Sequence, residues 1–165
     1  PVPEADLVDG LALRPWRSSD APALAAAWAD EAIASSLAPP DSSVAAATRW
    51  IDGWSERRDR GVALDLVIDV DGAVAGELGW SSFEPRRRAA LVGYWVGPDH
   101  RGQGLAARVL QATTAWFFEA LSGEALVAQC SPRNVASVRT AERAGYVHVG
   151  AQDGSAVYVR RRPSH

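Results

Sequence analysis

One stretch of sequence decides how the chain folds: Val96-Gly97-Pro98-Asp99-His100-Arg101-Gly102-Gln103-Gly104-Leu105-Ala106-Ala107. It joins the end of an apolar run to the start of a helical pattern, so it predicts a connection from a strand to a helix. Its glycines allow close backbone approach, and a helix start offers free N–H groups. Arg101 adds a positive charge with a planar donor fork. The stretch therefore predicts an anion site, and a phosphate-bearing ligand fits it best.

Three phosphate-binding motifs compete for this stretch. Gly102-x-Gly104-x-x-Ala107 formally matches a dinucleotide fingerprint, but that motif belongs to the first strand–helix turn of a large parallel sheet. Here it comes late in the chain, and Glu124 precedes the next strand instead of ending it. A P-loop needs lysine, and all 17 basic residues are arginine. The lack of lysine also excludes Schiff-base and Ser/Lys mechanisms. The third motif, Arg101-x-x-Gly104-x-Ala106, depends on the rest of the chain and is taken up below.

On either side of this stretch, apolar periodicity predicts an α/β (α+β) fold with the order βααβββαβαββ. Asp71-Gly72 and Asp153-Gly154 each separate two apolar runs and predict tight hairpins. A strand at Ala89–Val96, a helix at Gly104–Leu121 and a strand at Ala125–Cys130 predict a parallel crossover. The other expected strands are Leu11–Trp16, Val62–Val70, Ala73–Trp80, Tyr146–Ala151 and Ala156–Arg160, and the other helices end at Asp30, Arg60 and Ala144.

Composition narrows the class of protein. With 165 residues, 47% hydrophobic and 22% charged, the chain predicts a single globular domain over residues 1–165. No apolar run approaches the roughly 18 residues that span a bilayer, so no membrane association is expected. Cys130 is the only cysteine, and a cytoplasmic location is expected. The net charge of −3 and the lack of a recognition motif argue against nucleic acid as a partner. The run from Arg160 to Arg162 is expected to be a solvated terminus.

Several motifs together resemble one known family. Arg101-x-x-Gly104-x-Ala106 resembles the Arg/Gln-x-x-Gly-x-Gly/Ala signature of the GNAT superfamily of acyl-CoA N-acyltransferases. The landmarks of its RimJ/RimL-type branch are similar to Gly93-Tyr94-Trp95-Val96, Asn134-x-x-Ser137 and Glu142-Arg143-Ala144-Gly145-Tyr146. The resemblance covers roughly residues 11–160, and the element order is similar as well.

The resemblance implies a GNAT fold, with a mixed central sheet of about seven strands and helices on both faces. Acetyl-CoA would enter a cleft between splayed parallel strands at Ala89–Val96 and Ala125–Cys130. The loop amides would take its pyrophosphate, and Val96 and Asn134 would hold the pantetheine arm, although Asn134 is also a natural helix cap. By matching positions, the cofactor-binding residues are Val96, Arg101, Gly102, Gln103, Gly104, Leu105, Ala106 and Asn134.

Direct acyl transfer needs a neutral amine, a group that stabilises the oxyanion and a proton for the thiolate, but no metal. In the RimJ/RimL-type branch a Glu often lies where this chain has Leu91. Glu77 on the neighbouring strand is the expected substitute base, against the alternative of a solvated outward side chain. Ser137 is the expected proton donor, with helix capping as its alternative. Tyr94 is expected to face the cleft, with core packing as its alternative.

The absence of a glutamate at position 91 affects which kind of acceptor amine is expected. Deprotonating an amine with a pKa near 10.4 at pH 7 costs roughly 4.6 kcal/mol, whereas an α-amine near 7.8 costs about 1 kcal/mol. A weak base therefore favours the α-amino group of a peptide, an aminoacyl compound or a small molecule. Trp50, Trp54 and Trp80 are expected to border the acceptor mouth, with core packing as the alternative.

A second class of function stays open. Leu91 is compatible with an acyl-CoA-binding or regulatory module that has lost turnover. Dimers are common in the family, so the resemblance is also compatible with a homodimer.

Overall fold

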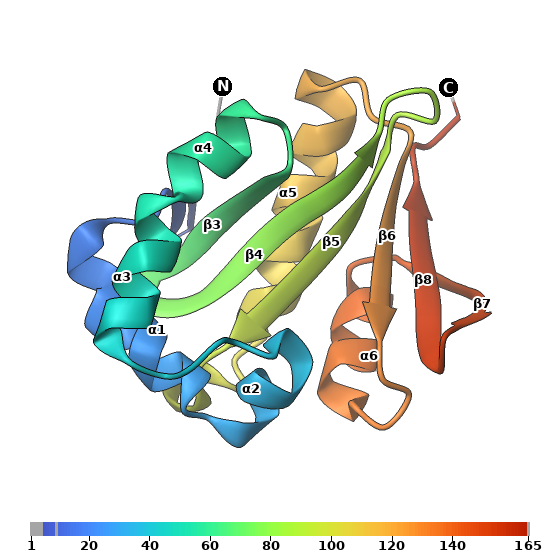
Figure 1. Cartoon of the computed structure of the whole chain (residues 1–165). Coiled ribbons are helices and arrows are strands. Elements are labelled where there is room, and N and C mark those ends of the chain that lie inside the picture. Colours follow the sequence, from blue (N-terminus) through green and yellow to red (C-terminus); the bar gives the residue numbers. More distant parts are fainter. Residues whose placement is uncertain (1–4, 9, 165) are drawn as a thin grey trace.

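A mixed sheet forms the centre of the molecule in the computed structural model, which describes residues 5–8 and 10–164 (Figure 1). Its strands are β1 (Ala5–Val8), β2 (Leu11–Arg14), β3 (Ala63–Val70), β4 (Ala73–Glu84), β5 (Ala89–Val96), β6 (Ala125–Cys130), β7 (Val147–Gln152) and β8 (Ser155–Arg161). They lie in the order β1-β2-β3-β4-β5-β6-β8-β7. All neighbours are antiparallel except β5 and β6, which are parallel.

Helices cover both faces of this sheet (Figure 1). They are α1 (Ala21–Trp28), α2 (Glu31–Leu37), α3 (Val44–Asp52), α4 (Trp54–Asp59), α5 (Leu105–Ala120) and α6 (Val135–Arg143). The first four lie on one face, and α5 and α6 lie on the other. No helix within the described ranges is long and apolar enough to cross a bilayer.

The core has two layers because strand side chains alternate between the faces. Leu78 and Trp80 of β4 point toward α5, where the ring of Trp80 stacks on Trp116 at 5.3 Å between centroids. On the other face, Trp16 and Trp50 meet edge to face at 5.7 Å. The fold expected from the sequence, a mixed sheet with helices on both faces, is confirmed.

The predicted turns and crossover are also confirmed. Asp71 and Gly72 both have positive φ, at 52° and 86°, and they join β3 to β4. Asp153 and Gly154 repeat this geometry between β7 and β8, with φ of 49° and 80°. Asp and Gly tolerate this left-handed region, so the local sequence was sufficient to locate both hairpins.

The N-terminal half differs from the prediction in three ways. Strand β1 was not predicted, and it brings the sheet to eight strands. Asp30 was expected to end a helix, but its carboxylate accepts a hydrogen bond from the Ile33 N–H (3.1 Å) and so begins α2. The helix expected to run to Arg60 is divided at Gly53 into α3 and α4. Glycine weakens a helix interior, which explains the division.

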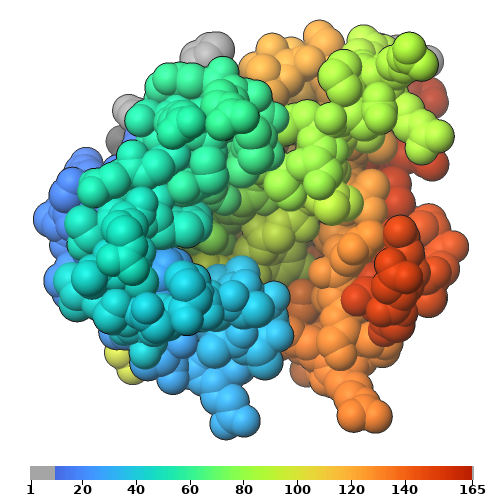
Figure 2. Space-filling view, in the orientation of Figure 1, coloured from blue at the N-terminus to red at the C-terminus, as the bar shows by residue number. Residues whose placement is uncertain are grey.

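Strands β5 and β6 part halfway along their length. Their register runs from Ala89 opposite Ala125 to Val92 opposite Ala128, and there the pairing ends although both strands continue. Gly93, the next residue of β5, is exposed in the middle of a central strand, and no atom lies within 4 Å of an ideal Cβ there. Figure 2 shows the molecule hollowed at this level, between α2 and β6. The parted strands therefore open a cleft in the sheet.

Two glycines on neighbouring strands give a matched test of this cleft. A Cβ at Gly76 of β4 would overlap the carbonyl oxygen of Trp95, whereas a Cβ at Gly93 would meet open space. We expect Gly76→Ala to lower the free energy of unfolding by about 1–3 kcal/mol through overpacking. Gly93→Ala should change it by no more than about 0.5 kcal/mol. Urea denaturation measures both, and equal destabilisation would contradict the presence of an open cleft at Gly93.

Candidate active site

The loop after β5 presents a free helix start to the cleft. Gly102 and Gly104 both have left-handed φ, 76° and 72°, and an ideal Cβ at either would meet nothing within 4 Å. Gly104 caps α5 without a side-chain hydrogen bond, and Leu105 and Ala106 follow in its first turn. The first backbone N–H groups of this 16-residue helix have no acceptor within the helix, so they suit an anion. The loop therefore has the geometry to hold a pyrophosphate.

Arg101 ties this loop to the end of β5 and to the start of α2. Its Nε donates to the carbonyl oxygen of Val96 (3.0 Å), and its Nη2 donates to Asp30 Oδ1 (2.8 Å). The hydrogen bond from Arg101 keeps the pKa of Asp30 below its ordinary value. Arg101 and its neighbour Gln103 are both exposed. Arg101 is thus positioned at the loop while part of its charge is already paired.

Tyr94 and Ser137 meet on the α6 side of the cleft. The Tyr94 hydroxyl donates to the Ser137 carbonyl oxygen (3.0 Å), and the Ser137 hydroxyl donates to the Tyr94 oxygen (3.4 Å). Burial raises the pKa of Tyr94 to about 12, so the phenol keeps its proton at neutral pH. Asn134 caps α6 by accepting from the Ser137 N–H (3.1 Å). Ser137 is the capped residue, so its hydroxyl is left to face Tyr94.

Cys130 belongs to the same group of side chains. It ends β6, beyond the last rung with β5, and it is buried. Burial raises the pKa of the thiol, while a hydrogen bond from Ser137 partly lowers it. Tyr94, Ser137 and Cys130 therefore bring three proton-bearing groups together where the strands part.

Glu77 occupies the opposite face of the sheet. The Trp16 Nε1 donates to one carboxylate oxygen (3.0 Å) and the Trp95 Nε1 donates to the other (3.2 Å). Only 9% of Glu77 is exposed, so the alternative of a solvated outward side chain is wrong. Burial, and after it the negative charge of Asp65, raise the pKa of Glu77 to about 8, although the two indole N–H groups oppose this rise. The carboxyl group therefore exchanges its proton near neutral pH.

Asp65 is a site residue that the sequence analysis missed. In the register of β3 and β4, Val67 lies opposite Glu77 and Asp65 lies opposite Gly79, so the two carboxyl groups are diagonal neighbours on one face. Burial raises the pKa of Asp65, and Arg57, which pairs with it at 3.6 Å, lowers it. Arg57 also has a buried Nη2 without a hydrogen-bond partner among the described residues. Asp65 and Asp69 both interrupt the apolar sequence of β3, and an aspartate at such a position was the available signal.

The strand register places the two proton-handling groups on opposite faces at one level. Glu77 lies opposite Trp95 and faces the α1–α4 side, whereas Tyr94, one residue earlier, lies opposite Leu78 and faces α5 and α6. Tyr94 lies on β5 beyond the point where β6 parts from it, and Glu77 lies one strand away on β4. This arrangement suits a transfer in which an amine approaches from one face and a leaving group departs toward the other.

Two of the three tryptophans expected at the acceptor mouth are core residues. Trp80 is 1% exposed and stacks on Trp116 on the α5 face, away from Glu77. Trp54 is also buried, and its Nε1 donates to the carbonyl oxygen of Asp65. Neither ring offers a face to an acceptor, so the structure corrects this expectation in favour of core packing.

Trp50 is only partly buried, but its ring faces are occupied as well. The Arg57 guanidinium lies 4.3 Å from the ring centroid, and Trp16 and Trp28 approach it edge to face. Trp50 can therefore reach an acceptor only if Arg57 moves. Arg57 links Trp50 to the carboxyl group of Asp65, with which it pairs at 3.6 Å.

Comparisons with known proteins agree with this geometry. Residues 11–147 match the family described as acetyltransferase (GNAT) domain. The ribosomal-protein-serine acetyltransferase of Escherichia coli is 29% identical over 91 residues, which are 55% of this chain and 51% of the relative, so the chain spans about half the length of that relative.

Solved structures share the fold. A probable acetyltransferase superposes with a TM-score of 0.87 at 19% identity, covering 96% of this chain and 97% of the other. RimL, a ribosomal L7/L12 alpha-N-protein acetyltransferase solved with coenzyme A, superposes with a TM-score of 0.79 at 23% identity, covering 94% and 96%.

Proposed function

The chain belongs to the acetyltransferase (GNAT) domain family, and from this we propose that it acetylates an α-amino group carried by a peptide, an aminoacyl compound or a small molecule. It is an acetyl-CoA N-acetyltransferase of the GNAT type, related to ribosomal-protein acetyltransferases. The observation that carries the proposed acceptor is Glu77, a buried carboxyl group beside the parted strands with its pKa raised to about 8.

We infer that acetyl-CoA binds in the cleft between β5 and β6. Beyond Val92, the backbone of β5 has no β6 neighbour and can pair with the amides of a pantetheine arm. The exposed N–H groups at Gly102–Ala106 suit the pyrophosphate, with Arg101 beside them. RimL, which shares the fold, was solved with coenzyme A. Val96 and Asn134 lie at the two sides of the arm in this arrangement.

In a direct transfer, side chains at this site can accept the proton that leaves the amine and donate the proton that the thiolate needs. The amine nitrogen forms a bond to the acetyl carbon, the carbon–sulfur bond breaks, and the thiolate leaves. Glu77 takes the proton from the amine, directly or through a water molecule. The hydroxyl of Ser137, hydrogen-bonded to Tyr94, gives a proton to the thiolate and regains one from solvent. No covalent enzyme intermediate is required.

The acceptor class follows from matched acidities. The pKa of Glu77, about 8, is close to the value near 7.8 of an α-amine. Proton transfer between the two is therefore almost balanced in free energy. A lysine side chain, with a pKa near 10.4, is a poorer match. The neighbouring Asp65 carboxyl group, when ionised, also attracts an ammonium group to this face.

Acceptor preference is tested with two peptides of equal length. One has a free α-amine and no lysine, and the other has a blocked α-amine and one lysine. We expect kcat/KM for the first to be at least about a hundredfold higher, because its amine is far easier to deprotonate. Mass spectrometry of the acetylated products measures both. Preference for lysine would overturn the proposal, and CoA binding without any product would favour the alternative of a binding module.

The pH dependence tests Glu77 as the base. Below about pH 7 both the α-amine and Glu77 must lose a proton, so log kcat/KM should rise with a slope near two up to the pKa of about 8. In Glu77→Gln only the amine titrates, and the slope should fall to one, with kcat lower by about 10²–10⁴-fold. Glu84→Gln, an exposed position on the same strand, is the control. A slope of two in Glu77→Gln would exclude Glu77 as the base.

Cofactor affinity tests Arg101. Calorimetric titration with CoA should show that Arg101→Glu binds about 10–100-fold more weakly, because a charge-assisted contact is replaced by repulsion. Asp30→Asn removes the ion pair but leaves the charge of Arg101, and it should bind CoA at least as tightly as the wild type. If both variants weaken equally, Arg101 only fixes the loop and does not contact phosphate.

A further inference from the structure

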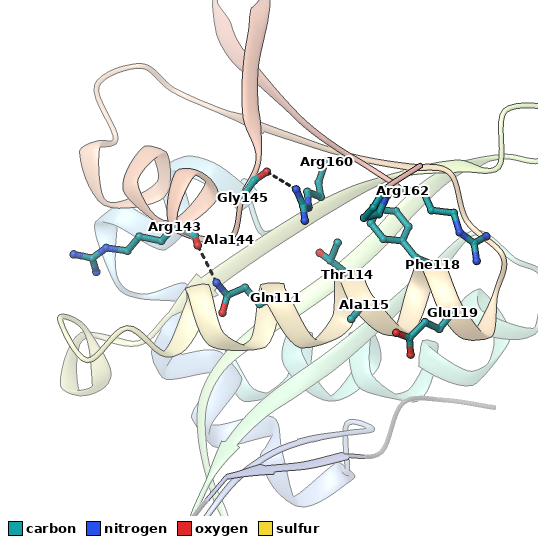
Figure 3. Close-up of a pocket in the computed structure, with 11 residues that line it drawn as sticks. Gln111, Thr114, Ala115, Phe118, Glu119, Arg143, Ala144, Gly145, Arg160 and Arg162 are labelled. Atoms are coloured by element: carbon teal, nitrogen blue, oxygen red, sulfur yellow. Dashed lines mark hydrogen bonds between the residues drawn. The ribbon is translucent and has the colours of Figure 1, made fainter. Parts of the chain in front are cut away.

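A shallow cavity of about 470 Å³ lies on the α5 face, between α5, the end of α6 and β8 (Figure 3). Arg160, which the sequence predicted to belong to a solvated terminus, is half-buried at this cavity and donates to the carbonyl oxygen of Gly145 (3.4 Å). Figure 3 shows the side chains of Arg143 and Arg162 directed away from the cavity, on opposite sides. These arginines therefore form no cluster there, and the charged groups nearest to the proposed base lie on the other face of the sheet.

Asp65 and Arg57 form an ion pair on the face of the sheet that carries Glu77. Asp65 lies on β3 and Arg57 on α4, and their Oδ2 and Nε atoms are 3.6 Å apart. Only 16% of the Asp65 side chain and 26% of the Arg57 side chain are exposed. Removing both charges from water costs free energy that an exposed pair does not incur. The position of the pair therefore points to a role at the site and not at the surface.

Two glycines leave room for this pair. An ideal Cβ at Gly79 would lie 2.7 Å from Asp65 Oδ1, and one at Gly53 would lie 2.9 Å from Arg57 Nη1. Gly79 is the second residue after Glu77 on β4, so both positions belong to the same face of the strand. The absence of a side chain at position 79 therefore lets the Asp65 carboxyl group lie over β4, next to Glu77.

Further contacts fix both members of the pair. Arg57 Nη1 donates to the carbonyl oxygen of Trp50 (2.9 Å), and the guanidinium lies 4.3 Å from the centroid of that ring. Trp54 Nε1 donates to the carbonyl oxygen of Asp65 (2.5 Å). Glu77 is held separately by the two indole N–H groups described above. The three charged side chains are thus held in the order Arg57, Asp65, Glu77 by groups that do not ionise.

This order determines which carboxyl group ionises first. Two neighbouring carboxyl groups resist a second negative charge, and Arg57 contacts Asp65 directly, so Asp65 loses its proton before Glu77 does. Burial raises the pKa of Glu77 most, the negative charge of Asp65 raises it as well, and Arg57 lowers it. Its other polar neighbours among the described residues, Trp16 and Trp95, are uncharged. Asp65 and Arg57 therefore act on the ionisation of Glu77 in opposite directions.

We propose that Asp65 and Arg57 are positioning residues, which act on the reaction through Glu77. The ionised Asp65 opposes a second negative charge beside it, so Glu77 binds a proton firmly enough to take one from an α-amine and then releases it to solvent. Arg57 keeps Asp65 ionised and limits its effect on Glu77. For the reaction itself, the inference rests on the role of Glu77 as the base proposed above.

Carbon NMR titration of the full chain, labelled at the glutamate carboxyl carbons, tests this without any substrate. The signal that is lost in Glu77→Gln identifies Glu77. We expect its midpoint, about 8 in the wild type, to fall by about one pH unit in Asp65→Asn, because the neighbouring negative charge is removed. The midpoint should rise by about half a pH unit in Arg57→Gln, because a positive charge is removed.

Two exposed positions give matched controls for these charge changes. Asp59→Asn and Arg60→Gln remove the same charges at the end of α4, next to Arg57 in the sequence. Solvent and salt screen exposed charges, so both variants should leave the midpoint of Glu77 within about 0.2 pH units of the wild type.

Opposite shifts separate this role from a structural one. A pair that only supports the fold would lower the thermal transition in both variants and shift the midpoint in neither. If Asp65→Asn does not fold, Arg57→Gln, at a partly exposed position, decides the test. An unchanged midpoint, or a shift in the direction opposite to the one stated, in either folded variant overturns the inference. Because the titration needs no turnover, an inactive protein would count against the proposed acetyl transfer and would not imitate these results.

Discussion

The whole site depends on the parting of two parallel strands. Between Ala89 and Val92, β5 satisfies its backbone through β6, and beyond that point it cannot. The backbone N–H and C=O groups of β5 beyond this point border an open cleft, where they are available to a ligand with amides of its own. The loop with Gly102 and Gly104 and the start of α5 stand at the end of that gap. The strand separation, the glycine loop and the helix start are therefore contiguous, and together they form the site proposed for the cofactor.

The two faces of the sheet carry different proton-transfer groups. Because successive side chains alternate, adjacent residues of β5 place Trp95 beside Glu77 on one face and Tyr94 beside Ser137 on the other. Burial raises the pKa of Glu77 toward that of an α-amine and keeps Tyr94 protonated. In the proposed reaction, the proton is therefore accepted on one face of the sheet and donated on the other.

Sequence reasoning succeeded where the signal is local. The hairpins at Asp71-Gly72 and Asp153-Gly154, the crossover and the glycine loop each lie within one short segment, and all were predicted. It failed where two distant segments decide the outcome. The burial of Glu77 depends on Trp16, sixty-one residues away, and the half-buried position of Arg160 depends on α5. Contacts between such distant segments leave no periodic pattern in the sequence, so they become visible only in the folded chain.

The bonds from Trp16 and Trp95 to Glu77 have an optical consequence. Two indole rings share one carboxyl group, so its ionisation introduces a negative charge beside both chromophores in a medium that screens poorly. The emission of these rings then changes with the protonation of Glu77. The protein thus carries an intrinsic fluorescent indicator of the ionisation of this carboxyl group, one that needs neither substrate nor label.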